Sequence, residues 1–220
     1  MAISSGPSRP SGYTYRDALR LLFILVRGSQ PVESSIDDEW DSVFIGEKRA
    51  LAIDFWVRYP DYLADELLDR FEKDGDQQAL SAAKEIFADE EPDVRQVQMI
   101  RWRRGAYEDL QTSLGVLSYR GLVRSMDRGL QNGIRQHEYL SGAAARDFLD
   151  SVLDDFPALR WYEKQTHLAL SIAGHQSGSA LKEIHYRDPE YGSTPFGSVI
   201  PSIRDRVRVR LQKLEEKEDG

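Results

Sequence analysis

Apolar positions along this chain recur mostly every three or four residues, the spacing that places side chains on one face of a helix. The clearest stretches are residues 14–27, 47–73, 107–119, 139–156, 160–172 and 202–214. Pro60 is expected to divide the second stretch into two helices, because proline disfavours helical geometry at the residue before it. Asp61 is expected to cap the helix that follows. The pattern predicts a predominantly helical protein.

A different pattern follows residue 119. Arg120-Gly121-Leu122-Val123 predicts the start of a strand, and a polar hairpin tip and a second strand come next. Tyr139-Leu140-Ser141-Gly142 then leads into another helix. Helix, strand, hairpin and helix is the order of a winged-helix domain. The expected fold class is therefore mainly α with a small β-hairpin wing: a winged-helix-like domain plus helical segments.

Two helices of this winged-helix candidate have an expected core face. Its members are Leu110, Leu114, Leu117 and Leu122 around the first helix, and Phe148, Leu149, Val152, Leu153 and Phe156 on the last. The stretch before these helices, residues 94–104, is ambiguous. Its apolar and basic positions fit one face of a strand as well as one face of a helix. We favour the helix.

Four regions are expected from these patterns. Residues 1–12, rich in Ser, Pro and Gly, predict a disordered arm. Residues 13–93 form an N-terminal helical region that contains a polar, acidic connection over residues 29–46. Residues 94–157 form the winged-helix-like domain. Residues 158–220 form a C-terminal helical region.

Composition narrows the function classes. The net charge of −8 over 220 residues argues against binding nucleic acid through the whole surface, although a local basic patch stays possible. The absence of cysteine excludes disulfides and zinc–thiolate sites. The longest apolar run, Leu21 to Val26, is too short to cross a bilayer, and the first ten residues lack the apolar core of a signal peptide. A cytoplasmic protein without membrane contact is expected.

Arginines gather in and around the winged-helix candidate, in contrast with the acidic chain as a whole. The candidate DNA or partner contacts are Arg101, Trp102, Arg103, Arg104, Arg120, Arg124, Arg128 and Arg135. In a winged helix the last core helix reads DNA and the hairpin touches the backbone. The same surface also docks proteins. Protein docking is favoured, because Glu108 and Asp109 lie where a DNA-reading helix needs neutral or basic residues.

Two basic segments allow two interpretations each. Arg101-Trp102-Arg103-Arg104 could stack and pair with single-stranded nucleic acid. A half-buried tryptophan with solvated arginines is the favoured interpretation. The final helix has a narrow apolar seam of Ile203, Val207, Leu211 and Leu214 among arginines. This seam fits a partner's acidic, apolar groove and equally fits simple packing on its own domain.

No catalytic constellation is evident in the sequence. The four histidines have no metal-ligand spacing, and no nucleotide-binding glycine loop is present. The segment Gly-His-Gln-Ser-Gly at 174–178 resembles a nucleophile turn, but its frame is wrong and no α/β sheet is expected around it. The expectation is a protein that is not an enzyme and has no cofactor. An unrecognised site near His175–Ser179 is the remaining enzymatic alternative.

Two segments resemble a known family. Ala52-Ile53-Asp54-Phe55-Trp56-Val57-Arg58-Tyr59-Pro60-Asp61-Tyr62-Leu63 is similar to a segment of the middle components of bacterial ABC-three-component, Lamassu-type defence systems. The segments from Arg103 to Tyr107, Arg120 to Val123 and Tyr139 to Gly142 are similar to their winged-helix part. The resemblance spans residues 15–185 loosely, and its motifs are structural rather than chemical.

The resemblance implies a non-catalytic accessory or adaptor subunit. Such a subunit bridges an SMC-like or AAA ATPase and an effector in an anti-phage or anti-plasmid defence complex. The expected partner is a large ATPase encoded nearby, and direct contact with DNA is possible. The alternative function is a winged-helix DNA-binding transcriptional regulator, which would be a symmetric dimer with steeply salt-dependent DNA binding.

Overall fold

The computed structural model describes residues 11–32, 39–88, 99–101, 110–129, 133 and 135–218. Over these residues the protein is mainly helical with one small antiparallel sheet. It divides into two compact units, each built from two separate stretches of chain. Unit 1 comprises Met1–Gly46 and Asp109–Asp154, and unit 2 comprises Glu47–Glu108 and Asp155–Gly220. Residues 13–46 therefore cluster with the winged-helix candidate, and not with residues 47–93 beside which the sequence places them.

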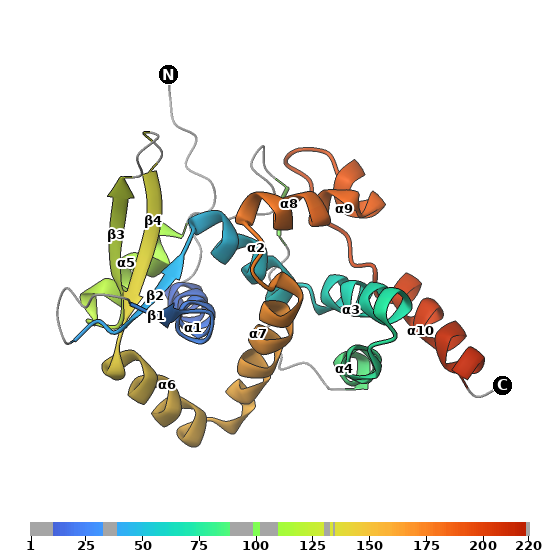
Figure 1. Ribbon diagram of the computed structural model, residues 1–220, viewed down its shortest axis with the longest axis horizontal. Coiled ribbons are helices and arrows are strands. Elements are labelled where there is room, and N and C mark those ends of the chain that lie inside the picture. Colours follow the sequence, from blue (N-terminus) through green and yellow to red (C-terminus); the bar gives the residue numbers. More distant parts are fainter. Residues whose placement is uncertain are drawn as a thin grey trace. The chain divides into compact units, whose positions relative to one another are not determined.

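Unit 1 surrounds the sheet. Its elements are α1 (Ser11–Arg27), β1 (Gln30–Pro31), β2 (Ser42–Ile45), α5 (Gln111–Tyr119), β3 (Arg124–Gly129), β4 (Arg135–Ser141) and α6 (Ala143–Asp155). The strands pair antiparallel in the order β1-β2-β4-β3, so the hairpin β3–β4 extends a sheet that begins near α1 (Figure 1). The predicted hairpin is confirmed.

Helix α1 supplies much of the core of unit 1. Every residue from Leu21 to Val26 is buried, and α1 packs on α5, β2 and β4. A helix that is apolar on all sides is expected in such a position. The helix begins at Ser11, so the predicted arm over residues 1–12 is wrong at its last two positions. Proline constrains the residue before it and leaves those after it free, so a helix can start directly after Pro10.

Strands β1 and β2 lie within the connection expected over residues 29–46. Val43 pairs with Leu140 and Phe44 with Tyr139, and all four side chains are buried. A run of only three apolar residues, Val43 to Ile45, in a polar stretch is too short to show the two-residue alternation that predicts a strand. The pairing partner, nearly one hundred residues later in the sequence, is what makes this segment extended.

The segment Arg120-Gly121-Leu122 ends helix α5, so the predicted strand start at Arg120 is wrong. Gly121 has φ +67°, its N–H donates to Ser118 O at 3.0 Å, and the Leu122 N–H donates to Leu117 O at 3.0 Å. This pair of bonds is a Schellman motif, whose left-handed position favours glycine. Strand β3 therefore starts four residues later, at Arg124.

Unit 2 is helical. Its elements are α2 (Glu47–Arg58), α3 (Pro60–Asp74), α4 (Gln77–Ala88), a 3-10 helix (Pro157–Leu159), α7 (Arg160–Ala173), α8 (Gly178–Arg187), α9 (Pro189–Ser193) and α10 (Arg204–Glu218). Helix α2 is central: every side chain from Ala50 to Arg58 is buried, and α2 packs on α3, α7 and α8. The predicted break before Pro60 is confirmed.

The ambiguous stretch 94–104 is extended where the structure describes it. Ile100 forms an antiparallel bridge with Val199, and Arg101 N–H donates to Ser198 O at 2.9 Å. Met99 and Arg101 are buried while Ile100 between them is 38% exposed, which is the alternation of a strand. The favoured helix is therefore wrong for these residues. Pairing with the segment before α10 overrides the local preference.

Helix α6 buries a narrower face than the one expected. Leu149 and Leu153 are buried as predicted, but Phe148 is 42% exposed and Phe156 is 61% exposed. Ala145 takes the buried position one turn before Leu149, so the core-facing stripe is narrower than the sequence suggests. On the first helix of the candidate, Leu110, Leu114, Leu117 and Leu122 are buried as expected.

Candidate interaction surface

Helix α5 exposes an uncharged face beside the hairpin. Ser113, Leu114 and Leu117 turn inward, whereas Gln111, Thr112, Gly115, Ser118 and Tyr119 are exposed. Tyr119 is 88% exposed and precedes Arg120, which is also exposed. Sequence reasoning missed Tyr119 as a contact residue. In the sequence, Tyr119 lies at the end of the predicted helix and off its leucine face, and this position indicates an exposed side chain.

The register of the hairpin separates its arginines. Arg124 pairs with Leu140 and Arg128 with Gln136, so these two arginines share one face of the ribbon. Arg135 pairs with Gly129 and lies on the opposite face. Of the predicted set, the structure brings Arg124 and Arg128 to a common face and leaves Arg135 behind it. All three side chains are exposed.

Arg128 is oriented by a buried carboxylate. Its Nε lies 3.0 Å from Glu138 Oε1, and the Glu138 side chain is only 3% exposed. Gln136 Nε2 donates to the same oxygen at 2.9 Å. The buried carboxylate of Glu138 therefore holds the Nε of Arg128 in place, although the Arg128 side chain is 60% exposed. A charge held in place at an exposed position loses less rotamer entropy when it binds a partner.

The local charge of this surface is positive. Residues 110–129 and 135–141 carry four arginines (Arg120, Arg124, Arg128 and Arg135) against Asp127 and Glu138, a formal balance of 4 − 2 = +2. Asp127 Oδ1 lies 2.7 Å from His137 Nδ1 on the other face from Arg124 and Arg128. The α5–hairpin surface is thus positively charged in a chain whose net charge is negative.

Helix α6 is tied to strand β2 by a bidentate ion pair. Arg146 donates to both Asp41 oxygens, at 2.7 and 2.6 Å. The guanidinium holds the pKa of Asp41 at about 2, below its usual value. This bond, together with the close approach of Gly142 to the Glu39 backbone, fixes the segment before β2 on the start of α6. The sheet that carries the hairpin is therefore anchored at the C-terminal end of β4.

The predicted contact Arg101 belongs to unit 2 and is buried. Its guanidinium donates to Gly192 O at 2.7 Å and to Thr194 O, and it lies over the rings of Tyr186, Tyr191 and Phe196. Such cation–π and carbonyl contacts fix the loop after α9. Trp102, Arg103 and Arg104 lie outside the described residues.

The loop at 174–178 has a structural role that the sequence did not reveal. Arg49 donates to Gly174 O at 2.8 Å and to Gln176 O at 2.7 Å. Ser177 Oγ accepts the Ala180 N–H at 3.2 Å, so this hydroxyl caps α8. The backbone at Gly178 lies so close to Lys48 and Arg49 that a β-carbon there would overlap them. The resemblance of this loop to a nucleophile turn is therefore explained by helix ends and close packing.

Metal ligands and membrane-spanning helices can be assessed for the described part of the chain. No three His, Asp or Glu side chains within it are arranged to hold a metal ion. Of its helices, none combines the length and apolarity needed to span a bilayer.

Comparison with known proteins identifies no relative: no family model, curated protein or solved structure matches this chain. The geometry of α5 and the hairpin is therefore the observation on which a functional proposal rests.

Proposed function

We propose that the chain is a non-catalytic accessory subunit whose unit 1 is a winged-helix-like docking domain. The strand order β2-β4-β3, with α5 leading directly into the hairpin, carries this proposal. A winged helix uses the helix before the hairpin and the hairpin itself as its contact elements. In unit 1 these are α5, with its uncharged exposed face, and the ribbon that presents Arg124 and Arg128.

Two compact units suit a bridging role. Each unit has its own core, and each therefore offers a separate outer surface within one chain. The resemblance to middle components of ABC-three-component systems supplies the proposed partners: an SMC-like or AAA ATPase and an effector of a defence complex. The exposed Tyr119 beside Arg120 supports protein docking, because tyrosine and arginine are enriched at the centres of protein interfaces.

Co-expression with the two genes flanking its native locus tests this proposal. A tagged copy should purify with a large ATPase, and native mass spectrometry should give one defined stoichiometry. The chain alone should be poorly behaved or monomeric. Purification of the chain as a stable homodimer, with neither neighbour bound, would contradict the bridging role.

DNA-binding regulation is the second candidate, and the +2 balance of the α5–hairpin surface favours it. Phosphate contacts by a few arginines would make binding fall as salt rises, roughly one power of salt concentration per phosphate neutralised. Fluorescence anisotropy with labelled duplex DNA at several salt concentrations distinguishes the two candidates. A regulator binds duplex DNA alone and loses affinity steeply with salt, whereas the accessory subunit shows weak binding or none without its partner.

A further inference from the structure

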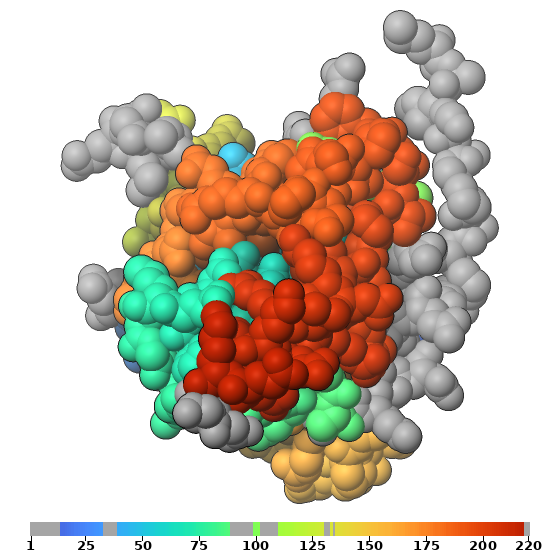
Figure 2. All heavy atoms as spheres, turned by 90° about the vertical axis from the view of Figure 1, so that its right-hand side faces the viewer, coloured from blue at the N-terminus to red at the C-terminus, as the bar shows by residue number. Residues whose placement is uncertain are grey.

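Helix α10 is attached to unit 2 along one narrow seam. Ile203, Val207, Leu211 and Leu214 are buried, while Val209 on the outer side is 54% exposed. The helix packs mainly on α3 and α4, and Figure 2 shows its atoms (red) at the front of the view beside those of both helices (turquoise and green). The seam predicted from the sequence therefore packs on the chain's own domain.

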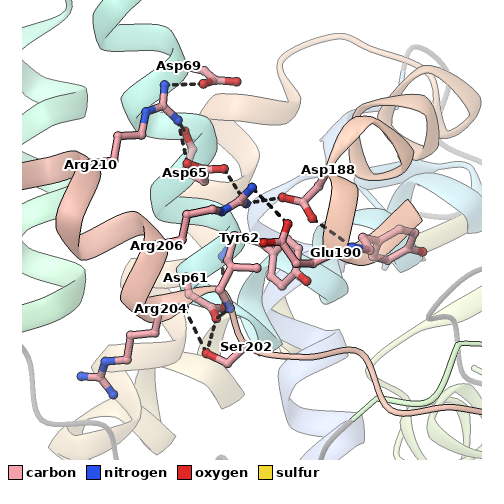
Figure 3. Close-up of polar contacts among 12 residues, drawn as sticks. Asp61, Tyr62, Asp65, Asp69, Asp188, Glu190, Ser202, Arg204, Arg206 and Arg210 are labelled. Atoms are coloured by element: carbon pink, nitrogen blue, oxygen red, sulfur yellow. Dashed lines mark hydrogen bonds and ion pairs between the residues drawn. The ribbon is translucent and has the colours of Figure 1, made fainter. Parts of the chain in front are cut away.

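Two arginines of α10 add ion pairs to this attachment (Figure 3), and Glu215 of α10 adds a pair with Lys84 of α4 at 3.2 Å. Arg206 pairs with Asp65 at 3.1 Å, with Glu190 at 3.0 Å and with Asp188. Arg210 pairs with Asp65 at 2.6 Å, with Asp69 at 2.5 Å and with Glu72. The acidic, apolar groove that the sequence suggested for a partner protein is thus present in the chain itself, on α3, α4 and α9.

The groove carries more negative charge than α10 neutralises. Two guanidiniums meet five carboxylates, a formal surplus of 5 − 2 = 3 negative charges. On α3, partial burial raises the pKa of Glu66 to about 8, and the nearby carboxylates of Asp69 and Asp65 add to this rise. Without α10 the five carboxylates would lose both of these arginine partners and repel one another, so the groove favours a basic helix.

The segment just before α10 is held independently of the groove. Tyr59 Oη donates to Ile200 O at 3.2 Å and Tyr62 Oη donates to Pro201 O at 3.0 Å. Asp61 Oδ2 accepts from Ser202 Oγ at 2.6 Å and from the Ile203 N–H at 2.8 Å. The helix α2, by contrast, packs on α3, α7 and α8. Release of α10 would therefore leave both the central packing and the anchored segment in place.

We propose that α10 is a latch: it opens as one element, and the groove beneath it takes up a basic amphipathic helix of the same pattern from a partner protein. Charge complementarity and the seated α10 itself define that occupant, with arginines one turn apart and apolar residues at every third or fourth position. Much of the attachment is ionic and partly exposed, so salt weakens it more than it weakens the apolar packing around α2. The latch lies in unit 2, and its failure would leave the proposed role of unit 1 unchanged.

Hydrogen exchange of the full chain tests the opening. Raising the salt from about 0.05 M to about 0.5 M, which shortens the screening length from roughly 14 to 4 Å, should speed exchange in α10 several-fold and leave α7 unchanged. The variant Arg206→Ala/Arg210→Ala should show fast α10 exchange at low salt. The control variant Lys213→Ala/Lys217→Ala removes two cations from the same helix outside the five-carboxylate cluster and should behave as wild type. Exchange of α10 and α7 at one common rate under all conditions would overturn the latch.

A labelled peptide of residues 201–218 tests the groove. The peptide can bind only open molecules, so its apparent affinity is proportional to the fraction of molecules that are open. The Arg206→Ala/Arg210→Ala chain opens more often and should therefore bind this peptide about tenfold more tightly than the wild type. The same peptide carrying Arg206→Glu and Arg210→Glu should not bind. Equal binding of the peptide to both chains, or no binding to the double variant, would refute the proposed groove.

Discussion

The carboxylate of Asp61 accepts backbone N–H groups from two segments of unit 2. The sequence predicts that it caps α3; the N-cap position of α3 is Tyr59, and Asp61 lies within the first turn, where its Oδ1 accepts the Tyr62 N–H at 3.1 Å. Its Oδ2 accepts the Ile203 N–H just before α10, about 140 residues later in the chain. The local sequence pattern indicates that Asp61 can accept hydrogen bonds from backbone N–H groups. Its partner before α10 depends on the tertiary fold and could not be predicted from that pattern.

Replacing Asp61 tests that role. Asp61→Ala leaves the buried Ile203 N–H without its acceptor and should lower the free energy of unfolding by about 1–3 kcal/mol. Asp61→Asn keeps a side-chain acceptor and should cost less than half as much. Chemical denaturation of both variants gives the comparison. Equal losses for Ala and Asn would show that the carbonyl-type acceptor at this position contributes little.

Glu66 should give unit 2 a characteristic pH dependence. Its pKa is raised to about 8 in the folded protein from the ordinary value near 4.5, so the folded state binds the extra proton between these pH values. The stabilisation is therefore complete below about pH 4.5 and is lost as pH rises through 8. Glu66→Gln should remove this loss, changing the slope of unfolding free energy by up to about 1.4 kcal/mol per pH unit. Parallel pH profiles for wild type and variant would contradict the raised pKa of Glu66.

At the scale of elements, leucine spacing predicted the helices and could not predict how they end or what pairs with them. The core leucines of α5 and the seam of α10 follow from helical periodicity alone. Strand β2 and the bridge at Ile100 did not, because each depends on a partner strand distant in the sequence. The arginine register on β3 and β4 likewise needed the pairing itself, since a shift of one residue would move each side chain to the other face.

The end of α5 offers a matched pair of glycine variants. Gly121→Ala places a side chain at φ +67° and should destabilise unit 1 by about 1 kcal/mol. Gly115→Ala, inside the same helix and with no atom near its new β-carbon, should stabilise by up to about 1 kcal/mol. Thermal unfolding of the two variants should therefore shift in opposite directions. A shift of both in the same direction would contradict the Schellman end assigned to α5.

At the scale of the whole molecule, two compact units are interleaved in the sequence. The chain leaves unit 1 after Gly46, forms part of unit 2 and returns at Asp109. Segment composition could not reveal this arrangement, because each stretch is helical and acidic connections occur inside both. The candidate contacts reflect the same division: Arg101 is buried in unit 2, whereas Arg120, Arg124, Arg128 and Arg135 belong to unit 1.

The account depends most on whether the α5–hairpin surface docks a protein partner. The direct measurement is co-purification of the flanking gene products with tagged wild type, with Arg124→Glu/Arg128→Glu, and with the control Arg135→Glu on the opposite face of the ribbon. We predict that the wild type and the control retain a large ATPase and that the double variant loses it, while all three remain folded by circular dichroism. Retention of the ATPase by the double variant, or the absence of any partner on the wild type, would contradict the proposed function.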